Sequence, residues 1–404
     1  MARVLFVLNS ASGGATRSAL DLIEALAPRG WEFCAVLPPT GEGPDLDRLR
    51  RHTLSIHMVP LPWWNRNYRA RPLRRLLHWG WRSLQSGFHA RTVHRVRRLI
   101  GELGIDLVHT NTSLTLDPAL AARRARVPHV WHLREQMGNG QLFRFWLTEP
   151  LLARTFVSLA DAVVANSQET RRLFARTGLA SAVQVVYNGV RLQDFVPSSA
   201  AAELRRSWCE GHDQVVVGMV AHLTSRMKRH DVFVRLAAKV LETEPNVRFV
   251  VVGADPERDG GYRTKLEYAR DLSQLAQRLG LGDRLLRTGA LSDVPAVMSA
   301  IDVLVHPSER ESFGRVAVEA MAAGKPVVGA ATGGVGEIVE DGVTGFTVAG
   351  DDPEAWTRPV LALVRDPMLR QSLGTAGHQR VAERFSLDVT ADRIETLYRE
   401  VLSR

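Results

Sequence analysis

The sequence predicts an α/β protein with two domains, in each of which the strands of a parallel sheet alternate with helices. Short apolar segments recur along the chain, each followed by a polar or glycine-containing turn and then by an amphipathic stretch. The first such series begins at residues 3–8 and a second begins at residues 214–220. This alternation is typical of βαβ units. A chain of 404 residues is also long enough to bury two separate cores.

Composition places the chain among ordinary globular proteins. Apolar residues make up 45% of the chain and charged residues 24%. No apolar run reaches the ~18 residues of a membrane span, and the apolar amino terminus turns polar at Asn9, too early for the core of a secretory signal. The two cysteines, Cys34 and Cys209, indicate neither a disulfide framework nor a thiolate metal site. We therefore expect a cytoplasmic protein.

The first strand leads into a glycine turn. Residues 3–8 read as a buried strand, Gly13 and Gly14 follow after a short polar stretch, and an amphipathic helix comes next. A strand, a glycine turn and a helix start form an arrangement that binds phosphate groups. The G-x-G-x-x-G spacing of a dinucleotide site is absent. Alternatively, the glycines form a turn that merely lets the helix pack on the strand.

Two later strands of the first half each end in a histidine. The segments 105–109 and 128–132 finish at His109 and His132. The carboxyl ends of parallel strands are where α/β proteins bind their ligands. A single histidine at such a place either contacts a ligand or has a structural role, and the sequence leaves both open.

Residues 303–345 carry the most informative pattern. An apolar strand at 303–305 is followed by a polar turn and, from about Ser312, by apolar residues at the i, i+3, i+4 spacing of a helix. Glu311 precedes this helix and Glu319 lies two turns into it. At about 100° per residue the two positions differ by roughly 80°, so both carboxylates are expected to face one ligand site. A pair of solvated carboxylates is the alternative.

This stretch resembles the family 4 retaining glycosyltransferases. The resemblance rests on Glu311-x7-Glu319 within ESFGRVAVEA, on AAGKPVV, on GG-x-x-E and on the DG-x-TGF run at residues 341–346. It implies the GT-B fold, in which two Rossmann-like domains face a cleft and a C-terminal helix crosses back to the first domain. The expected boundaries are 1–190 for the acceptor-side domain, 191–213 for a linker, 214–384 for the nucleotide-sugar-binding domain and 385–404 for the crossover helix.

The same resemblance assigns roles to individual residues. Glu311 would lie near the hexose, and Glu319 would accept hydrogen bonds from the ribose. His132 would face the donor sugar and the acceptor. Lys228 and an arginine would grip the diphosphate of a nucleoside-diphosphate sugar. The family places that arginine six residues before the lysine, where this chain has His222, so Arg226 is expected to substitute. The donor-binding positions implied are Gly13, Gly14, Gly253, Gly289, Phe313, Gly314 and Glu319.

The resemblance also implies a co-substrate but no cofactor and no metal. The Asp45-x-Asp47 sequence spells a metal-binding motif of some glycosyltransferases, but it precedes a basic helix-like stretch and we discount it. No His, Cys, Asp or Glu cluster elsewhere has convincing ligand spacing. Two alternative functions remain: a nucleotide-sugar epimerase of the same fold, and a protein that binds nucleic acid or another anionic surface. The hypothesis of nucleic-acid binding does not explain the motifs at Glu311 and Glu319, so we expect no nucleic-acid partner.

Residues 63–98 form the most basic part of the chain. They contain ten arginines and four tryptophans, and no acid occurs between Arg48 and Gly101. Arginine and tryptophan together favour an anionic membrane surface. We expect this segment to hold the enzyme at the inner membrane face and to admit a sugar or lipid-linked acceptor, such as a cell-surface glycan precursor. A nucleic-acid patch and a solvated cover helix in an arginine-rich protein are the alternatives.

Overall fold

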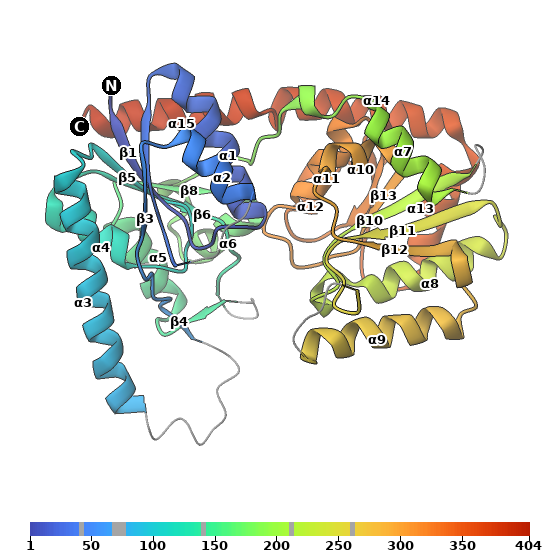
Figure 1. The fold of residues 1–404 in the computed structure, drawn as a ribbon, viewed down its shortest axis with the longest axis horizontal. Helices are drawn as coiled ribbons and strands as arrows, with labels where there is room; N and C mark the ends of the chain where they lie inside the picture. The colour runs from blue at the N-terminus through green and yellow to red at the C-terminus, as the bar shows by residue number, and fades with distance from the viewer. Residues whose placement is uncertain (40–43, 67–77, 139–142, 210–213, 259–262) are drawn as a thin grey trace. The chain divides into compact units, whose positions relative to one another are not determined.

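The computed structural model describes residues 1–39, 44–66, 78–138, 143–209, 214–258 and 263–404 (Figure 1). They form two compact units, an N-terminal unit of Met1–Gly189 with Leu387–Arg404, and a C-terminal unit of Val190–Ser386. Each unit contains a parallel sheet with helices packed on it, so the α/β prediction is confirmed. The segment expected as a linker, 191–213, belongs to the C-terminal unit and contains helix α7 (Ser199–Trp208).

The N-terminal unit is built on a seven-stranded parallel sheet with the strand order β3-β2-β1-β5-β6-β8-β9. Its strands are β1 (Arg3–Val7), β2 (Glu32–Leu37), β3 (Ser55–Met58), β5 (Leu107–Thr110), β6 (His129–Leu133), β8 (Ala162–Ala165) and β9 (Val183–Val185). Its helices are α1 (Gly14–Leu26), α2 (Pro44–His52), α3 (His78–Glu102), α4 (Asp117–Ala125), α5 (Glu149–Ser158), α6 (Gln168–Arg176) and α15 (Leu387–Leu402). A small antiparallel pair, β4 (Asn65–Arg66) and β7 (Arg144–Phe145), lies outside this sheet.

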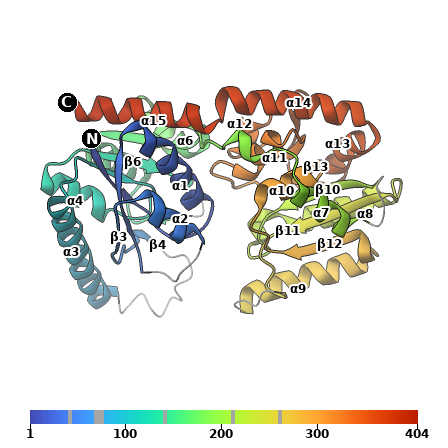
Figure 2. The same cartoon turned by 45° about the horizontal axis from the view of Figure 1, so that its top comes forward.

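Both faces of this sheet are covered, which explains why its strands are apolar at consecutive positions. Helices α1 and α15 pack on one face around Phe6 and Phe33, while α3 and α4 cover the opposite face near Val36 and Val108. Figures 1 and 2 show α15, in red, lying alongside α1, in blue. The last helix of the chain is therefore part of the first unit's core.

The C-terminal unit has a six-stranded parallel sheet with the strand order β12-β11-β10-β13-β14-β15. Its strands are β10 (Val215–Val220), β11 (Val247–Val252), β12 (Leu285–Gly289), β13 (Val303–His306), β14 (Val327–Ala330) and β15 (Gly345–Val348). Besides α7, its helices are α8 (His230–Leu241), α9 (Arg263–Arg278), α10 (Val294–Ala300), α11 (Arg315–Ala322), α12 (Val335–Ile338), α13 (Pro353–Arg365) and α14 (Pro367–Arg384). Its core is formed by β-branched strand residues and by Phe233, Phe249 and Trp356, all fully buried.

The basic segment predicted at residues 63–98 lies only partly within the described residues. Residues 67–77, which include Arg69, Arg71, Arg74 and Arg75, are outside them, as are the side chains of Arg66 and of residues 78–88. Of the tryptophans, Trp63 is 46% exposed, whereas Trp64 packs against Phe145 and Phe156. The described arginines of α3, at 91, 95, 97 and 98, are exposed. Within the described part of the chain, no helix has both the length and the apolar character needed to cross a bilayer.

Candidate active site

The glycine turn predicted to bind phosphate lies between β1 and α1. Gly13 is the residue before the helix and has a φ of 104°, a backbone conformation that favours glycine. Gly14 is the first helical residue and has no positive φ. A Cβ atom at either position would have no neighbour within 4 Å. Neither packing nor backbone conformation therefore requires glycine at position 14.

The two strand-end histidines come together in the N-terminal unit. The ring centroids of His109 in β5 and His132 in β6 are 5.3 Å apart, and His109 stacks on Phe6. Tyr398, from α15, places its hydroxyl 2.7 Å from Nδ1 of His109. Burial lowers the pKa of both histidines well below the ordinary value, and the positive charge of Arg134 lowers them further. Both rings are therefore neutral at neutral pH.

Arg134 lies beside these histidines and is almost completely buried. Its guanidinium donates from Nε to Asn111 Oδ1 at 2.8 Å and from another nitrogen to Asn188 Oδ1. A third nitrogen lies 3.3 Å from Nδ1 of His132. The arginine is thus held by polar groups that follow β5 and β9, and it faces the histidine of β6.

In the C-terminal unit, the carboxylate of Glu311 is the centre of a charged cluster. Its Oε1 accepts a hydrogen bond from Nζ of Lys228 and lies 3.2 Å from Nε2 of His306. Lys228 ends a short 3-10 turn (Arg226–Lys228), and His306 is the last residue of β13. Burial alone would raise the pKa of Glu311, but the ammonium of Lys228 and the contact with His306 together hold it well below its ordinary value. Glu311 is therefore an anion throughout the physiological pH range.

The helix after Glu311 begins later than the sequence pattern predicts. We expect it from about Ser312, whereas α11 begins at Arg315, because Gly314 has a left-handed φ of 96° and interrupts the helical path. Glu311 consequently lies in a loop, and the 80° helical rotation does not describe its relation to Glu319. Glu319 is buried on α11 and accepts a hydrogen bond from Nε of Arg315 at 2.7 Å.

The glycines of the loop after β14 have a packing role. The backbone N–H of Gly334 donates to the carbonyl oxygen of Glu311 at 2.9 Å. A Cβ atom on Gly334 would lie 2.4 Å from the carbonyl oxygen of Phe313, and one on Gly333 would lie 2.8 Å from that of Glu311. Only glycine allows the two loops to approach so closely, so this loop holds the Glu311 segment in place. Phe313 itself is buried and packs edge-on against Phe385.

Arg226 and His222 do not join the Glu311 cluster. The guanidinium of Arg226 forms an ion pair with Asp271 on α9 and lies over the ring of Tyr268, and its side chain is 70% exposed. Nδ1 of His222 accepts a hydrogen bond from the backbone N–H of Ala254 at 2.8 Å. The substitution of Arg226 for the missing arginine therefore stays a prediction.

The other two predicted glycines end neighbouring strands. A Cβ atom on Gly253, just after β11, would lie 2.3 Å from the carbonyl oxygen of Ala221, so glycine is required there by the close approach of two backbones. Gly289, at the end of β12, has a φ of 80°. Both lie at the carboxyl edge of the C-terminal sheet, where ligands bind in α/β folds.

His306, Arg134 and Tyr398 are among the residues of these clusters that were not predicted from the sequence. His306 follows the same rule as His132, a histidine at a strand's carboxyl end, and this signal was sufficient to find it. Arg134 and Tyr398 carry no such local signal, because their contacts join segments far apart in the chain.

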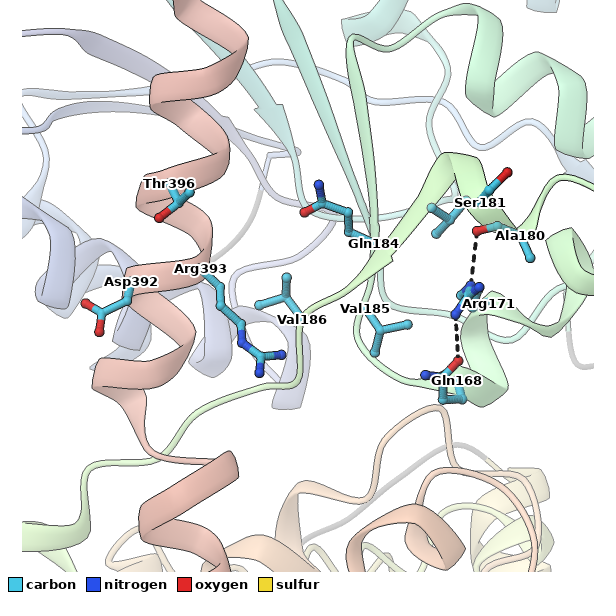
Figure 3. Close-up of a pocket in the computed structure, with 11 residues that line it drawn as sticks. Gln168, Arg171, Ala180, Ser181, Gln184, Val185, Val186, Asp392, Arg393 and Thr396 are labelled. Atoms are coloured by element: carbon cyan, nitrogen blue, oxygen red, sulfur yellow. Dashed lines mark hydrogen bonds between the residues drawn. The ribbon is translucent and has the colours of Figure 1, made fainter.

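Two other features are not assigned to the active site. A surface cavity of about 600 Å³ lies beside the edge strand β9. Its lining includes polar residues of α6 and α15 such as Arg171 and Arg393, which are labelled in Figure 3. It contains none of the predicted residues and lies along the side of the sheet. Asp45 and Asp47 on α2 form ion pairs with Arg17 and Arg50. Within the described ranges, no group of three His, Cys, Asp or Glu side chains is placed to hold a metal ion.

Two protein families match consecutive parts of the chain and together cover most of it. Residues 12–194 match the family described as Glycosyltransferase Family 4, and residues 201–380 match the family described as Glycosyl transferases group 1. The D-inositol 3-phosphate glycosyltransferase of Thermobifida fusca is 34% identical over 310 residues, which cover 74% of this chain and 70% of the relative. The protein of the same name from Kribbella flavida is 33% identical over 324 residues, which cover 77% and 74%.

Solved structures resemble the chain over nearly its whole length. The crystal structure of Anabaena Alr3699/HepE in complex with UDP and glucose has a TM-score of 0.77 and 26% identity, and covers 98% of this chain and 100% of that one. A glycosyltransferase from Rickettsia africae has a TM-score of 0.79 at 19% identity, with 99% and 98% coverage, and supports the fold alone. The GT-B fold expected from the sequence is confirmed.

Proposed function

Since this chain belongs to glycosyltransferase family 4 and transfers a sugar from a nucleotide sugar, we propose that it does so with retention at the anomeric carbon and without a metal ion. The observation that carries this proposal is the contact of Lys228 and His306 with the partly buried carboxylate of Glu311. The contact brings together a cation that can neutralise a leaving phosphate and an anion that can stabilise a developing positive charge.

Lys228 is assigned to the departing diphosphate. An ammonium group has three donors on a flexible stem, so it can contact Glu311 and a phosphate oxygen at the same time. Neutralising charge that develops on the leaving group is the largest single contribution in many enzymes. Helix α11 has no side-chain cap at its amino terminus, where an anion is favoured by the helix dipole. Lys228 and this helix start together supply the positive potential that a metal ion provides elsewhere.

Arg226 would supply a second positive charge to the diphosphate once its ion pair with Asp271 breaks. Both side chains of that ion pair are more than half exposed, and exposed pairs contribute only about 0–1 kcal/mol. A doubly charged diphosphate therefore competes well with one carboxylate. Gly13 and Gly14 are assigned to the donor's diphosphate.

The two glutamates receive different roles. Glu311 stays ionised, so it cannot act as a general acid; it stabilises an oxocarbenium-like carbon or accepts hydrogen bonds from hexose hydroxyls. Glu319 is assigned to the ribose, because its carboxylate on α11 can accept hydrogen bonds from hydroxyl groups. His132 is assigned to the donor sugar. In this scheme a phosphate oxygen of the leaving diphosphate accepts the proton of the acceptor's hydroxyl group. The hydroxyl attacks the sugar on the same face from which the diphosphate departs.

We assign the donor to the UDP-sugars and the acceptor to hydroxyl compounds that carry phosphate. The first assignment is supported by the HepE complex with UDP and glucose. The second is supported by the relatives named for D-inositol 3-phosphate and by the charge of residues 1–190, which contain 25 arginines and 13 acidic residues. A lipid-linked phosphate and a phosphorylated polyol share this chemistry.

The test is a donor and acceptor screen with product analysis. Thermal-shift measurements against a panel of nucleotide sugars find the donor, because a ligand that binds only the folded state raises stability. Proton NMR of the product then reports the anomeric configuration, and we expect retention. EDTA should leave kcat and KM unchanged. An inverted product, or activity that vanishes with EDTA and returns with Mg²⁺, would overturn the proposal.

A basic face on the N-terminal unit is assigned to an anionic membrane surface. We define it by its exposed arginines on the adjacent helices α3 and α4, at positions 91, 95, 97, 98, 123 and 124. Each such side chain near an anionic leaflet contributes about 1 kcal/mol. Full-length protein should therefore cosediment with phosphatidylglycerol vesicles at low salt and be released at high salt.

The matched variants change three arginines each. Changing Arg91, Arg95 and Arg124 together to Gln should weaken vesicle binding by roughly 100-fold, because each arginine contributes about 1 kcal/mol. The control variant changes three exposed arginines of the C-terminal unit to Gln: Arg235, Arg278 and Arg358. It should bind the vesicles as the wild type does. Equal binding to neutral and anionic vesicles would remove the membrane assignment and leave the basic face as solvated surface.

A further inference from the structure

The contact between Arg134 and His132 determines which nitrogen of the imidazole carries the proton. Nδ1 of His132 lies 3.3 Å from a guanidinium nitrogen of Arg134. A guanidinium has only donors and does not lose its proton in proteins. Nδ1 must therefore be the acceptor, with its lone pair toward Arg134. In a neutral imidazole the proton then lies on Nε2.

Arg134 can impose this choice because its orientation is fixed by other contacts. Its Nε donates to Asn111 at 2.8 Å, and a terminal nitrogen donates to Asn188. Asn111 is held in turn by a hydrogen bond to the carbonyl oxygen of Ala15 in α1. With only 6% of its surface exposed, the guanidinium has little freedom to turn away from His132.

The Nε2 atom of His132 is the other half of the observation. It is buried, the residue is 1% exposed, and no described residue accepts a hydrogen bond from it. A buried N–H group without a partner costs about 1–3 kcal/mol, and such groups in native proteins call for an explanation. A sugar hydroxyl can accept this hydrogen bond. Such a contact would explain why the N–H group of His132 at the carboxyl end of β6 has no protein acceptor among the described residues.

We propose that Arg134 is a positioning residue that holds His132 in the Nε2–H tautomer, so that the imidazole donates a hydrogen bond to the sugar. This inference rests on the proposed function, which assigns His132 to the donor sugar. It also excludes His132 as a general base through Nε2, because that nitrogen already carries a proton. The acceptor's proton must then go elsewhere, which agrees with its transfer to the donor's phosphate.

The decisive measurement is the tautomer itself, recorded without any substrate. Full-length protein labelled with ¹⁵N-histidine gives long-range ¹H–¹⁵N correlations that distinguish a protonated ring nitrogen from an unprotonated one, and a His132→Gln sample identifies the signals. We expect Nε2 protonated and Nδ1 unprotonated in the wild type. Protonated Nδ1 in the wild type would overturn the proposal whatever the variants do.

Two variants separate positioning from a merely structural role. Arg134→Met removes the donor, so His132 should become a mixture of both tautomers, its pKa should rise, and kcat/KM should fall about 2- to 10-fold, the loss that one neutral hydrogen bond explains. Arg134→Lys keeps a group that can only donate, and it should preserve the Nε2–H signal. Arg48→Met removes another partly buried arginine of the same unit, paired with Asp21 and Glu24, and should leave the His132 spectrum unchanged.

The outcomes also distinguish this inference from the proposed function. An Arg134→Met protein that folds and keeps the pure Nε2–H tautomer would overturn the inference, because the arginine would then not select it. If that variant does not fold, the wild-type and Arg134→Lys spectra still decide. A wild type with the expected tautomer but no glycosyl transfer to any acceptor would refute the proposed function and leave the assignment of the proton intact.

Discussion

Replacing Gly14 by alanine should stabilise the N-terminal unit and impair catalysis at the same time. Gly14 is the first residue of α1, it has no positive φ, and a Cβ atom there would meet nothing within 4 Å. Alanine in place of a helical glycine stabilises a protein by about 0.4–1 kcal/mol where the backbone accepts it. For a domain of 150–250 residues this corresponds to a rise in Tm of about 1–4 °C.

The loss of activity follows from the proposed contact with the diphosphate. A methyl group at Gly14 would keep a phosphate from approaching the backbone, so one hydrogen bond to a charged group would be lost. Such a bond contributes about 1.5–3 kcal/mol, which corresponds to a decrease in kcat/KM of about 10- to 150-fold. Most of the decrease should be a higher KM for the nucleotide sugar, because the phosphate is bound before and during transfer.

Calorimetry and steady-state kinetics on the same preparations test both halves of this prediction. The matched control is Gly101→Ala in α3, where a Cβ also meets nothing within 4 Å and φ is not positive. It should stabilise the protein without changing kcat/KM. A Gly14→Ala enzyme with unchanged kcat/KM would refute the assignment of the glycine turn to the donor. A lower Tm would refute the conclusion that the space above Gly14 is open.

Lys228→Met should lower the free energy of unfolding at neutral pH, because the largely desolvated carboxylate of Glu311, 15% exposed, would then lose the ammonium that pairs with it. The folded-state pKa of Glu311 lies below its unfolded value near 4.5, so the difference from wild type should be largest above that pH and shrink as the pH falls below it. Lys239→Met, which removes an exposed pair with side chains 41% and 69% exposed, should change urea titrations little at any pH. Glu319→Gln should mainly raise the KM for the donor, whereas Glu311→Gln should lower kcat, and a change in KM alone for both would contradict the assigned roles. Tyr398→Phe leaves Nδ1 of His109 buried without its partner and should cost about 1–3 kcal/mol of stability, so an unchanged Tm would contradict the contact.

The alternation of strands and helices could be predicted from the sequence because both sheets are parallel and covered on both faces. Their strands are therefore short runs of β-branched and aromatic residues, which stand out between glycine-containing turns. The start of α11 could not be predicted, since the apolar spacing already begins at about Ser312. The left-handed backbone of Gly314 decides where the helix starts, and the sequence pattern does not record backbone angles.

The glycine loop after β14 shows a different limit. Glycine is compatible both with an anion-binding turn and with the close approach of two loops, and the sequence does not distinguish them. The structure shows the second role at Gly333 and Gly334. Likewise, the sequence finds His132 by its place at a strand end, but its partner Arg134 and the supporting Asn188 come from a network that only the folded chain brings together.

The position of α15 has a consequence for how the protein is made. This helix supplies Ala391, Ile394, Leu397 and Tyr398 to the buried face of the N-terminal sheet, yet it is translated after the whole C-terminal unit. At about 5–20 residues per second, the roughly 200 residues that follow Gly189 take on the order of 10–40 s to synthesise. For that time the apolar surface around Phe6 and Phe33 lacks its cover on the ribosome. The nascent N-terminal unit is thus a candidate client of a chaperone that binds exposed apolar sheets until α15 has been synthesised.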